Sequence, residues 1–408
     1  MSGLDRAVIV GGGQSAIRAI EAIRASNQTM SITLIVDEGV LPYSRPPLSK
    51  EFLRFEKEPS DLALTSHSWM QENQVSLVTD RASRIDAAAK RIYVGGRSLP
   101  FDRLLLATGS RPRELNIPGV RLRRVFYLRT LGDAKAIRTE LTTARSVVVV
   151  GGGLIGLEVA ASVVQLGCQA TVIETAPRLL QRVAGADVGE FFRQLHESNG
   201  VRVVTGSSVQ RIEGSETVEA IVTSCGKRIA ADLVVIGIGV VPNVELAEEA
   251  GLNVQDGIVV DAACRTSASG IFAAGDVTFQ PNAFLDQILR LETEQNAQEQ
   301  GSAAGRNLSG DSVVHESKLW FWSNQFSSNF QSIGVPRCGD RLVVRGELSS
   351  GRFLVFYVRA GRIVAINAIN MPGAVFQARR LMTSPQQISV DALADERIGL
   401  ADLVRRCT

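Results

Sequence analysis

Two glycine-rich segments have the spacing of turns that bind the phosphates of a dinucleotide. The first, GGGQSA at 11–16, follows an apolar run, and so does the second, GGGLIG at 151–156. In a G-x-G-x-x-G/A turn, the first glycine permits the bend, the second lets the backbone approach a pyrophosphate, and the third small residue lets a helix pack against the strand. We therefore assign cofactor-binding roles to Gly11, Gly13, Ser15, Ala16, Gly151, Gly153, Ile155 and Gly156.

An acidic residue about 20 positions after each turn completes the pattern, because it is placed to accept a hydrogen bond from a ribose hydroxyl. These residues are Asp37 and Glu174. A hydride donor and a tightly held flavin are the economical reason for two dinucleotide sites in one chain, so the first site is predicted to hold FAD and the second NADH. Glu174 would repel a 2′-phosphate, which favours NADH over NADPH, although Arg178 and Arg182 could reach such a phosphate. Gene duplication with one degenerate site is the alternative.

The elements that position these turns alternate between strands and helices. Apolar residues at Ile17, Ile20 and Ile23 have helical spacing, and short apolar strands precede each turn and follow each helix. This order predicts an α/β fold with parallel sheets. At 408 residues the chain exceeds the roughly 250–300 residues at which a single core stops growing, so we expect two or three domains.

Composition excludes several classes of protein. The formal net charge of +2 gives no overall field to recruit nucleic acid or an anionic membrane, and no apolar run approaches the ~18 residues of a membrane span. The five cysteines, with no C-x-x-C, and the three isolated histidines provide neither a dithiol nor a metal site. The start, MSGLDRAVIVGGG, has no signal-peptide pattern, so we expect a cytoplasmic protein.

Further motifs give the chain, almost from end to end, a resemblance to the FAD-dependent ferredoxin reductases of bacterial oxygenase systems. The most diagnostic is LPYSRPPLSKEFL at 41–53, in which prolines stiffen a loop that presents Arg45 and Lys50. LLLATGSRPR at 104–113 and TSASGIFAAGDV at 266–277 resemble FAD motifs of the wider glutathione-reductase-like group. The turn at 11–16 departs from many relatives in having Ala16 instead of glycine.

The resemblance implies roles for individual residues. Lys50 would lie at the flavin ring and Asp276 would bind the ribityl and pyrophosphate part of FAD, next to the terminus of a following helix. Ile155 and Glu158 would align the nicotinamide, and Trp322, in the segment WFWSNQ, would stand beside the flavin. Glu292 and Glu294 would lie near the isoalloxazine. Glu294 stands where an apolar residue is more usual, so its contact with the cofactor is expected through the backbone. The remaining cofactor contacts would be Ala82, Ala107, Thr108, Gly109, Arg129, Gly239 and Gly275.

The implied fold is glutathione-reductase-like, with two dinucleotide-binding domains and a C-terminal α+β domain. We expect a discontinuous FAD domain at 1–113 and 246–320, an NADH domain at 114–245 and the C-terminal domain at 321–408. Each nucleotide domain should carry a crossover β-ribbon, and a pair of helices near 374–382 and 390–404 should cover the C-terminal sheet.

The implied activity is an NADH-dependent reductase that passes single electrons from FAD to a [2Fe–2S] ferredoxin serving a cytochrome P450 or a Rieske dioxygenase. No cysteine precedes Cys168, which removes the thiol relay of disulfide-reducing relatives. We expect a monomer or weak dimer, and a basic patch for the ferredoxin drawn from Arg290, Arg345, Arg379 and Arg380. The alternatives are a rubredoxin reductase and a redox-signalling flavoprotein like apoptosis-inducing factor.

Overall fold

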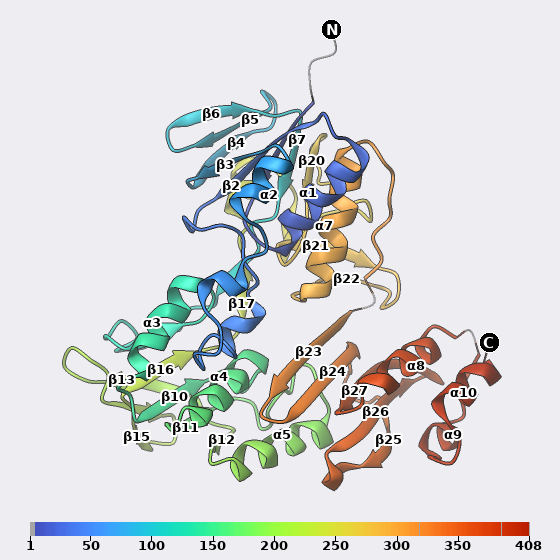
Figure 1. Cartoon of the computed structure of the whole chain (residues 1–408). Helices are drawn as coiled ribbons and strands as arrows, with labels where there is room; N and C mark the ends of the chain where they lie inside the picture. Colours follow the sequence, from blue (N-terminus) through green and yellow to red (C-terminus); the bar gives the residue numbers. More distant parts are fainter. Residues whose placement is uncertain (1–4, 318, 385, 408) are drawn as a thin grey trace. The chain divides into compact units, whose positions relative to one another are not determined.

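A computed structural model describes residues 5–317, 319–384 and 386–407, which divide into two compact units (Figure 1). Unit 1 comprises the described residues within 1–46, 58–111 and 240–319, and unit 2 comprises those within 47–57, 112–239 and 320–408. The chain therefore leaves unit 1 and returns to it, as the expected discontinuous FAD domain requires. The three-domain boundaries given above remain a prediction.

Unit 1 is built on a five-stranded parallel sheet in the order β20-β7-β1-β2-β3. Two helices, α1 and α7, lie side by side on this sheet (Figure 1). They approach closely because Gly301 and Gly305 of α7 face the backbone of Ser15 and Ala19, where an added Cβ would meet oxygen atoms at 2.4 and 2.3 Å. The bounds are β1 Arg6–Val10, α1 Gln14–Ser26, β2 Ser31–Val36, β3 Val75–Thr79, β7 Arg103–Leu106, β20 Ile271–Ala273 and α7 Glu294–Leu308.

Two smaller sheets complete unit 1. The antiparallel sheet β4-β5-β6 is the expected crossover ribbon, and β18-β19-β21-β22 forms a second, four-stranded sheet. Strands β8 and β17 pair next to the points where the chain leaves and re-enters the unit. The bounds are η2 Pro59–Leu62, α2 His67–Glu72, β4 Ala82–Asp86, β5 Arg91–Val94, β6 Arg97–Pro100, β8 Ser110–Pro112, β17 Val240–Pro242, α6 Glu245–Glu249, β18 Val254–Gln255, β19 Gly257–Val259, β21 Thr278–Asn282 and β22 Gln287–Arg290.

Unit 2 begins with a second parallel sheet in the order β12-β11-β10-β16-β9, which carries its own antiparallel ribbon, β13-β14-β15. The strands β10 and β16 are buried along their whole length apart from Ser146, as in a sheet covered on both faces. The bounds are η1 Pro46–Ser49, β9 Val125–Tyr127, α3 Leu131–Leu141, β10 Ser146–Val150, α4 Leu154–Gln165, β11 Gln169–Ile173, α5 Ala186–Ser198, β12 Arg202–Val204, β13 Val209–Glu213, β14 Ala220–Thr223, β15 Arg228–Ala230 and β16 Leu233–Ile236.

The C-terminal part of unit 2 is a five-stranded antiparallel sheet, β23-β24-β27-β26-β25, with helices on it. Its core is continuous with that of the parallel sheet, because Phe192 of α5 packs edge-on against Phe330, with ring centroids 5.4 Å apart. The bounds are β23 Trp320–Gln325, β24 Ser328–Gly334, β25 Arg341–Glu347, η3 Leu348–Ser350, β26 Arg352–Arg359, β27 Arg362–Ile369, α8 Pro372–Met382, α9 Val390–Ala394 and α10 Leu400–Cys407.

The C-terminal helices differ from the expected pair. Helix α8 forms as predicted, but the segment 390–404 is split into α9 and α10. The break falls where Arg345 reaches the C-terminal end of α9, donating hydrogen bonds to the carbonyls of Leu393 and Asp395 at 3.2 and 3.0 Å. Such donors satisfy carbonyls that a continuous helix would have bonded internally. Among the described residues, no helix combines the length and the apolar character needed to cross a membrane.

Candidate cofactor and electron-transfer site

The first glycine turn has the shape that a pyrophosphate requires. Gly11 has φ +117°, and an added Cβ would lie 2.1 Å from the carbonyl oxygen of Ala107, so only glycine fits there. At Gly13 a Cβ would meet nothing within 4 Å, which leaves open space in front of the turn. Gly13 also begins α1 without a side-chain cap, so backbone N–H groups at the helix N-terminus face that space. These features fit an anionic group of FAD.

The segment Gly275-Asp276 is fixed beside this turn. Gly275 has φ +86°, and an added Cβ would lie 2.4 Å from the hydroxyl oxygen of Ser15. Its N–H donates to Gln300 at 2.8 Å, while the hydroxyl of Ser110 donates to Asp276 at 3.1 Å. The expectation of a helix directly after Asp276 is wrong, because the chain continues into strand β21. The carboxylate therefore depends on hydrogen bonds, not on a helix terminus, for its position.

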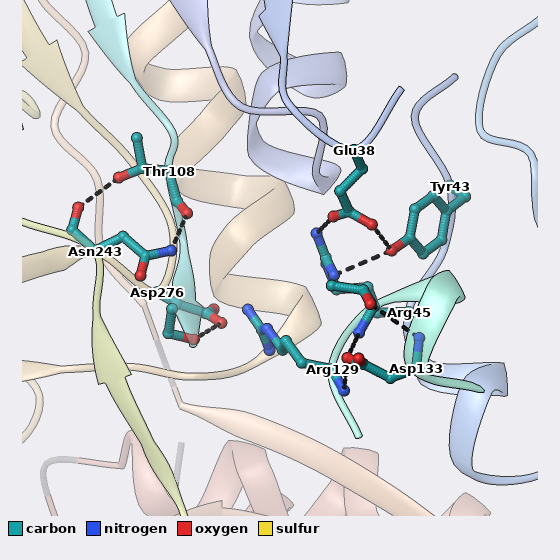
Figure 2. Close-up of polar contacts among 10 residues, drawn as sticks. Glu38, Tyr43, Arg45, Thr108, Arg129, Asp133, Asn243 and Asp276 are labelled. Atoms are coloured by element: carbon teal, nitrogen blue, oxygen red, sulfur yellow. Dashed lines mark hydrogen bonds and ion pairs between the residues drawn. The ribbon is translucent and has the colours of Figure 1, made fainter. Parts of the chain in front are cut away.

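Sequence reasoning missed Asn243, which holds the Ala107-Thr108-Gly109 turn (Figure 2). Its side-chain amide donates to the carbonyl of Thr108 at 2.8 Å, and the hydroxyl of Thr108 donates back to the carbonyl of Asn243 at 2.8 Å. Its backbone N–H donates to the carbonyl of Gly109 at 3.0 Å. The available signal was the sequence V-P-N directly after a predicted strand, which we did not connect with a turn more than 130 residues earlier.

A polar cluster lies where the first ribose-binding acid was expected (Figure 2). Asp37 is exposed at the end of β2, whereas Glu38 binds Arg45 at 2.6 Å and accepts a hydrogen bond from Tyr43. Burial lowers the pKa of the Arg45 guanidinium, but Tyr43, Glu38 and Asp276 outweigh burial and leave that pKa raised. The ribose role of Asp37 stays a prediction. Glu38, the acid that directly follows Asp37, was not among the predicted contacts.

The other predicted FAD contacts lie in varied surroundings. Ala82 is buried at the start of β4. The backbone N–H of Arg129 donates to Asp133 at 3.1 Å just before α3 (Figure 2). Glu292 is paired with Arg290, and Glu294 accepts a hydrogen bond from Gln14 at 2.9 Å, tying α7 to the start of α1. Glu294 thus has a side-chain role that its departure from the usual residue type did not suggest.

The second glycine turn repeats the geometry of the first. Gly151 has φ +114°, and an added Cβ would lie 2.3 Å from the carbonyl oxygen of Gly237, while a Cβ at Gly153 would again meet nothing within 4 Å. A Cβ at Gly156 would lie 2.1 Å from the carbonyl oxygen of Gly151, which explains the third glycine. Gly239, at φ +102°, bends the chain after β16. This turn also fits a pyrophosphate at a helix N-terminus.

The acid of the second turn is held in place by the backbone. Glu174 accepts hydrogen bonds from the N–H groups of Gly152 at 2.6 Å and Ala176 at 2.7 Å. Ile155, in the first turn of α4, keeps 47% of its surface exposed, although it is a large apolar residue. An oriented carboxylate and an exposed apolar side chain suit a ribose and a flat nicotinamide, respectively.

A buried ion pair joins η1 and the following residue to α4 in unit 2. The ammonium of Lys50 lies 2.9 Å from the carboxylate of Glu158 on α4, and their side chains are 4% and 3% exposed. Glu158 also accepts hydrogen bonds from Ser49 and, at 2.6 Å, from Ser323 of β23. The ammonium lies 5.3 Å from the ring centroid of Trp322, within the range of a cation–π interaction. Lys50, Glu158 and Trp322, far apart in the sequence, thus form one cluster.

Sulfur takes no part in this cluster. Among the described cysteines, Cys168, Cys225, Cys264 and Cys338 are all free, and burial raises the pKa of Cys264 to about 12. A thiol with such a pKa is a poor nucleophile near neutral pH. In the parts of the chain that the structure describes, no three His, Cys, Asp or Glu side chains gather into a metal site.

Two of the four arginines proposed for a basic docking patch are unsuited to it. Arg345 is 7% exposed, and its guanidinium donates to carbonyl groups at the end of α9 and just after it. The side chain of Arg290 is 8% exposed and is neutralised by Glu292 and Asp256. The prediction was wrong for both because sequence alone does not show which arginines are buried. Arg379 is partly buried and Arg380 is exposed, in the last turn of α8.

Comparisons with known proteins match the chain over nearly its whole length. The family model for pyridine nucleotide-disulphide oxidoreductases matches residues 5–301, and a model for the reductase C-terminal domain matches 320–404. A ferredoxin–NAD(+) reductase component of an anthranilate 1,2-dioxygenase system from Burkholderia cepacia is 41% identical, covering 97% of this chain and 98% of the relative.

Two further matches bear on the electron acceptor. A rubredoxin–NAD(+) reductase of Pseudomonas putida is 36% identical, covering 90% of this chain and 96% of the relative. The crystal structure of a covalent complex of putidaredoxin reductase with putidaredoxin is similar with a TM-score of 0.95 and 35% identity, covering 99% of both chains.

Proposed function

Since this chain belongs to the pyridine nucleotide-disulphide oxidoreductase family, as a ferredoxin–NAD(+) reductase that binds FAD and NAD(H), we propose the following path for its electrons. It takes hydride from NADH onto FAD and passes electrons singly to a [2Fe–2S] ferredoxin that serves an oxygenase. The relative from an anthranilate 1,2-dioxygenase system supports this proposal, and so does the match to a putidaredoxin reductase in complex with putidaredoxin. Each match covers at least 97% of this chain, including both dinucleotide turns and the C-terminal sheet.

The observation that carries the proposal is the sulfur-free cluster of Lys50, Glu158 and Trp322. A disulfide-reducing member of this fold needs cysteines near its flavin, whereas this chain has none before Cys168. This chain has a buried ammonium–carboxylate pair next to an indole ring, which we propose to lie at the flavin. Such a site can tune and shield a redox cofactor, but it offers no thiol to carry electrons onward. An external one-electron carrier is the outcome consistent with that composition.

The residues of this chain have positioning and electrostatic roles. Gly11, Gly13 and Asp276 bind the pyrophosphate and ribityl parts of FAD, which supplies the hydride-accepting chemistry when bound. Ile155 and Glu158 orient the nicotinamide, and Lys50 contributes positive charge beside the flavin ring. No side chain has to act as a general acid or base, because hydride transfer depends on placement.

Preference for NADH rests on Glu174. Its two backbone hydrogen bonds hold the carboxylate where a 2′-hydroxyl can donate to it, and a 2′-phosphate would meet a like charge. Arg178 and Arg182 are exposed nearby in the sequence, so the strictness of the preference is a matter for measurement. Action in the cytoplasm is part of the same proposal, because NADH is available there.

The test is a comparison of acceptors. The purified protein is reduced with NADH, and the initial rates of reduction of a [2Fe–2S] ferredoxin, a rubredoxin and a quinone are measured under identical conditions. The proposal predicts the highest kcat/KM for the ferredoxin. Preference for the rubredoxin would establish the second candidate, which the 36% identity to a rubredoxin–NAD(+) reductase keeps open. Slow turnover with every carrier would favour a redox-signalling role.

A further inference from the structure

A chain of hydrogen bonds leads from the carboxylate of Glu158 to a histidine on another helix. Ser323 lies 2.6 Å from Glu158, Gln325 lies 3.1 Å from Ser323, and the Nε2 atom of His196 lies 2.8 Å from Gln325. Each of these four side chains is at most 3% exposed. The chain runs within unit 2, from α4 through β23 to α5. Buried polar groups that are bonded in series fix one another's orientation.

The position of each proton in this series of hydrogen bonds follows from counting donors and acceptors. Glu158 already accepts from Lys50, and an ionised carboxylate can only accept, so the single hydroxyl proton of Ser323 must point to Glu158. Ser323 therefore accepts a hydrogen bond from Gln325, so the amide NH2 of Gln325 is the donor. The amide oxygen of Gln325 then faces His196, and the proton of the imidazole must sit on Nε2.

A histidine at this position reduces the free energy of unfolding, and an apolar side chain would not have this effect. With its proton on Nε2, the ring leaves Nδ1 as a bare acceptor, and Nδ1 is buried without a hydrogen-bond partner among the described residues. An unpaired buried polar atom costs about 1–3 kcal/mol. Burial also lowers the pKa of His196, which keeps the ring neutral near pH 7. What the ring provides in return is one donor aimed at Gln325.

We propose that Ser323, Gln325 and His196 are positioning residues that hold Glu158 and offset its negative charge by donating toward it in series. The effect on the flavin rests on the proposed function, which places Glu158 and Lys50 beside the flavin and nicotinamide. Reduced flavin is anionic, so an uncompensated carboxylate nearby disfavours reduction. Loss of the Ser323 donor increases the field of the carboxylate and also strengthens its hold on Lys50, and both effects lower the reduction potential.

The chain offers a matched control for Ser323. Ser332 on the neighbouring strand β24 is also fully buried, and it accepts a hydrogen bond from Asn367 at 2.9 Å. Ser332→Ala therefore removes a buried, hydrogen-bonded serine of the same sheet without touching Glu158. At the other end, His196→Gln keeps a donor that can reach Gln325, whereas His196→Leu removes it.

The first measurement concerns the chain of donors alone. Long-range ¹H–¹⁵N correlation spectra of the full chain distinguish the two neutral tautomers of His196, and the sequence has only two other histidines, His67 and His315. A proton on Nε2 is expected. A proton on Nδ1 would overturn the proposal, because Gln325 could then not accept from the ring. This result does not depend on whether the chain reduces a ferredoxin.

The second measurement is the two-electron reduction potential of the bound flavin. Ser323→Ala is expected to lower the reduction equilibrium about tenfold, which is about 30 mV for a two-electron couple, and His196→Leu to lower it less. Ser332→Ala and His196→Gln should leave the potential at the wild-type value. Equal effects of Ser323→Ala and Ser332→Ala, or of the two His196 variants, would overturn the proposal. Ser323→Ala carries the test if His196→Leu does not fold.

Discussion

Removing one partner of the Lys50–Glu158 pair should destabilise the protein more than removing both. Each side chain is at most 4% exposed, and the two charges lie 2.9 Å apart, so either one left alone is a buried charge without its counter-ion. Breaking such a pair costs about 3–5 kcal/mol. Lys50→Met and Glu158→Gln should each lower the free energy of unfolding by this amount, because Met cannot neutralise Glu158 and Gln cannot neutralise Lys50.

The double variant Lys50→Met/Glu158→Gln leaves no unpaired charge. Ser49 and Ser323 face different oxygens of Glu158, so one of them can donate to the amide oxygen of Gln while the other accepts from its NH2 group. We therefore expect it to be more stable than either single variant. At about 2–4 °C per kcal/mol for a folding unit of this size, each single variant should melt roughly 6–20 °C below the wild type.

The assay is a double-mutant cycle on thermal unfolding, followed by circular dichroism, with the flavin bound and again after its removal. The cycle on the flavin-free protein isolates the pair from any effect on flavin affinity. Melting temperatures of the single variants close to that of the wild type, or a double variant whose loss equals the sum of the single losses, would refute the reasoning.

Three further predictions follow from the glycine turns, Glu174 and His315. Gly11→Ala should fail to fold or lose its flavin, since its Cβ would lie 2.1 Å from a carbonyl oxygen, whereas Gly13→Ala should fold normally and lose flavin only; circular dichroism and the flavin-to-protein absorbance ratio separate these outcomes. Glu174→Ala should raise the KM for NADH about 10–100-fold, as loss of hydrogen bonds to a charged group implies, and a KM within twofold of wild type would contradict the ribose assignment. Burial lowers the pKa of His315 from 6.5 to about 4. Between these two pH values only the unfolded chain binds the proton, so the free energy of unfolding should fall as pH falls; above pH 6.5 neither state binds it. His315→Phe should flatten the stability–pH profile between pH 6.5 and about 4.

Much of the site was predictable because its determinants are local. A glycine that must adopt positive φ, and an acid one strand later, are fixed by short stretches of chain, and the geometry of Gly11, Gly151 and Glu174 agrees with what their spacing indicated. The motif around Lys50 was recognisable because prolines restrict it. These features needed no knowledge of long-range packing.

The features that escaped prediction depend on residues brought together by the fold. Asn243 and Thr108 are 135 residues apart, and His196 and Gln325 are 129 apart, so no spacing rule connects them. His196 looked like an isolated histidine for the same reason. The arginines show the converse case, because Arg290 and Arg345 resemble surface charges in sequence but have buried side chains in the fold. Arg345 donates to the carbonyl of Leu393, 48 residues later, which no local pattern indicates.

The central claim is that electrons pass from NADH to an external iron–sulfur carrier without a thiol. The most direct measurement uses a variant with all five cysteines replaced by serine or alanine, the flavin bound, and a [2Fe–2S] ferredoxin as acceptor. The account predicts NADH-dependent ferredoxin reduction at the wild-type kcat. A protein that binds no flavin, or one whose ferredoxin reduction disappears with the cysteines, would contradict it.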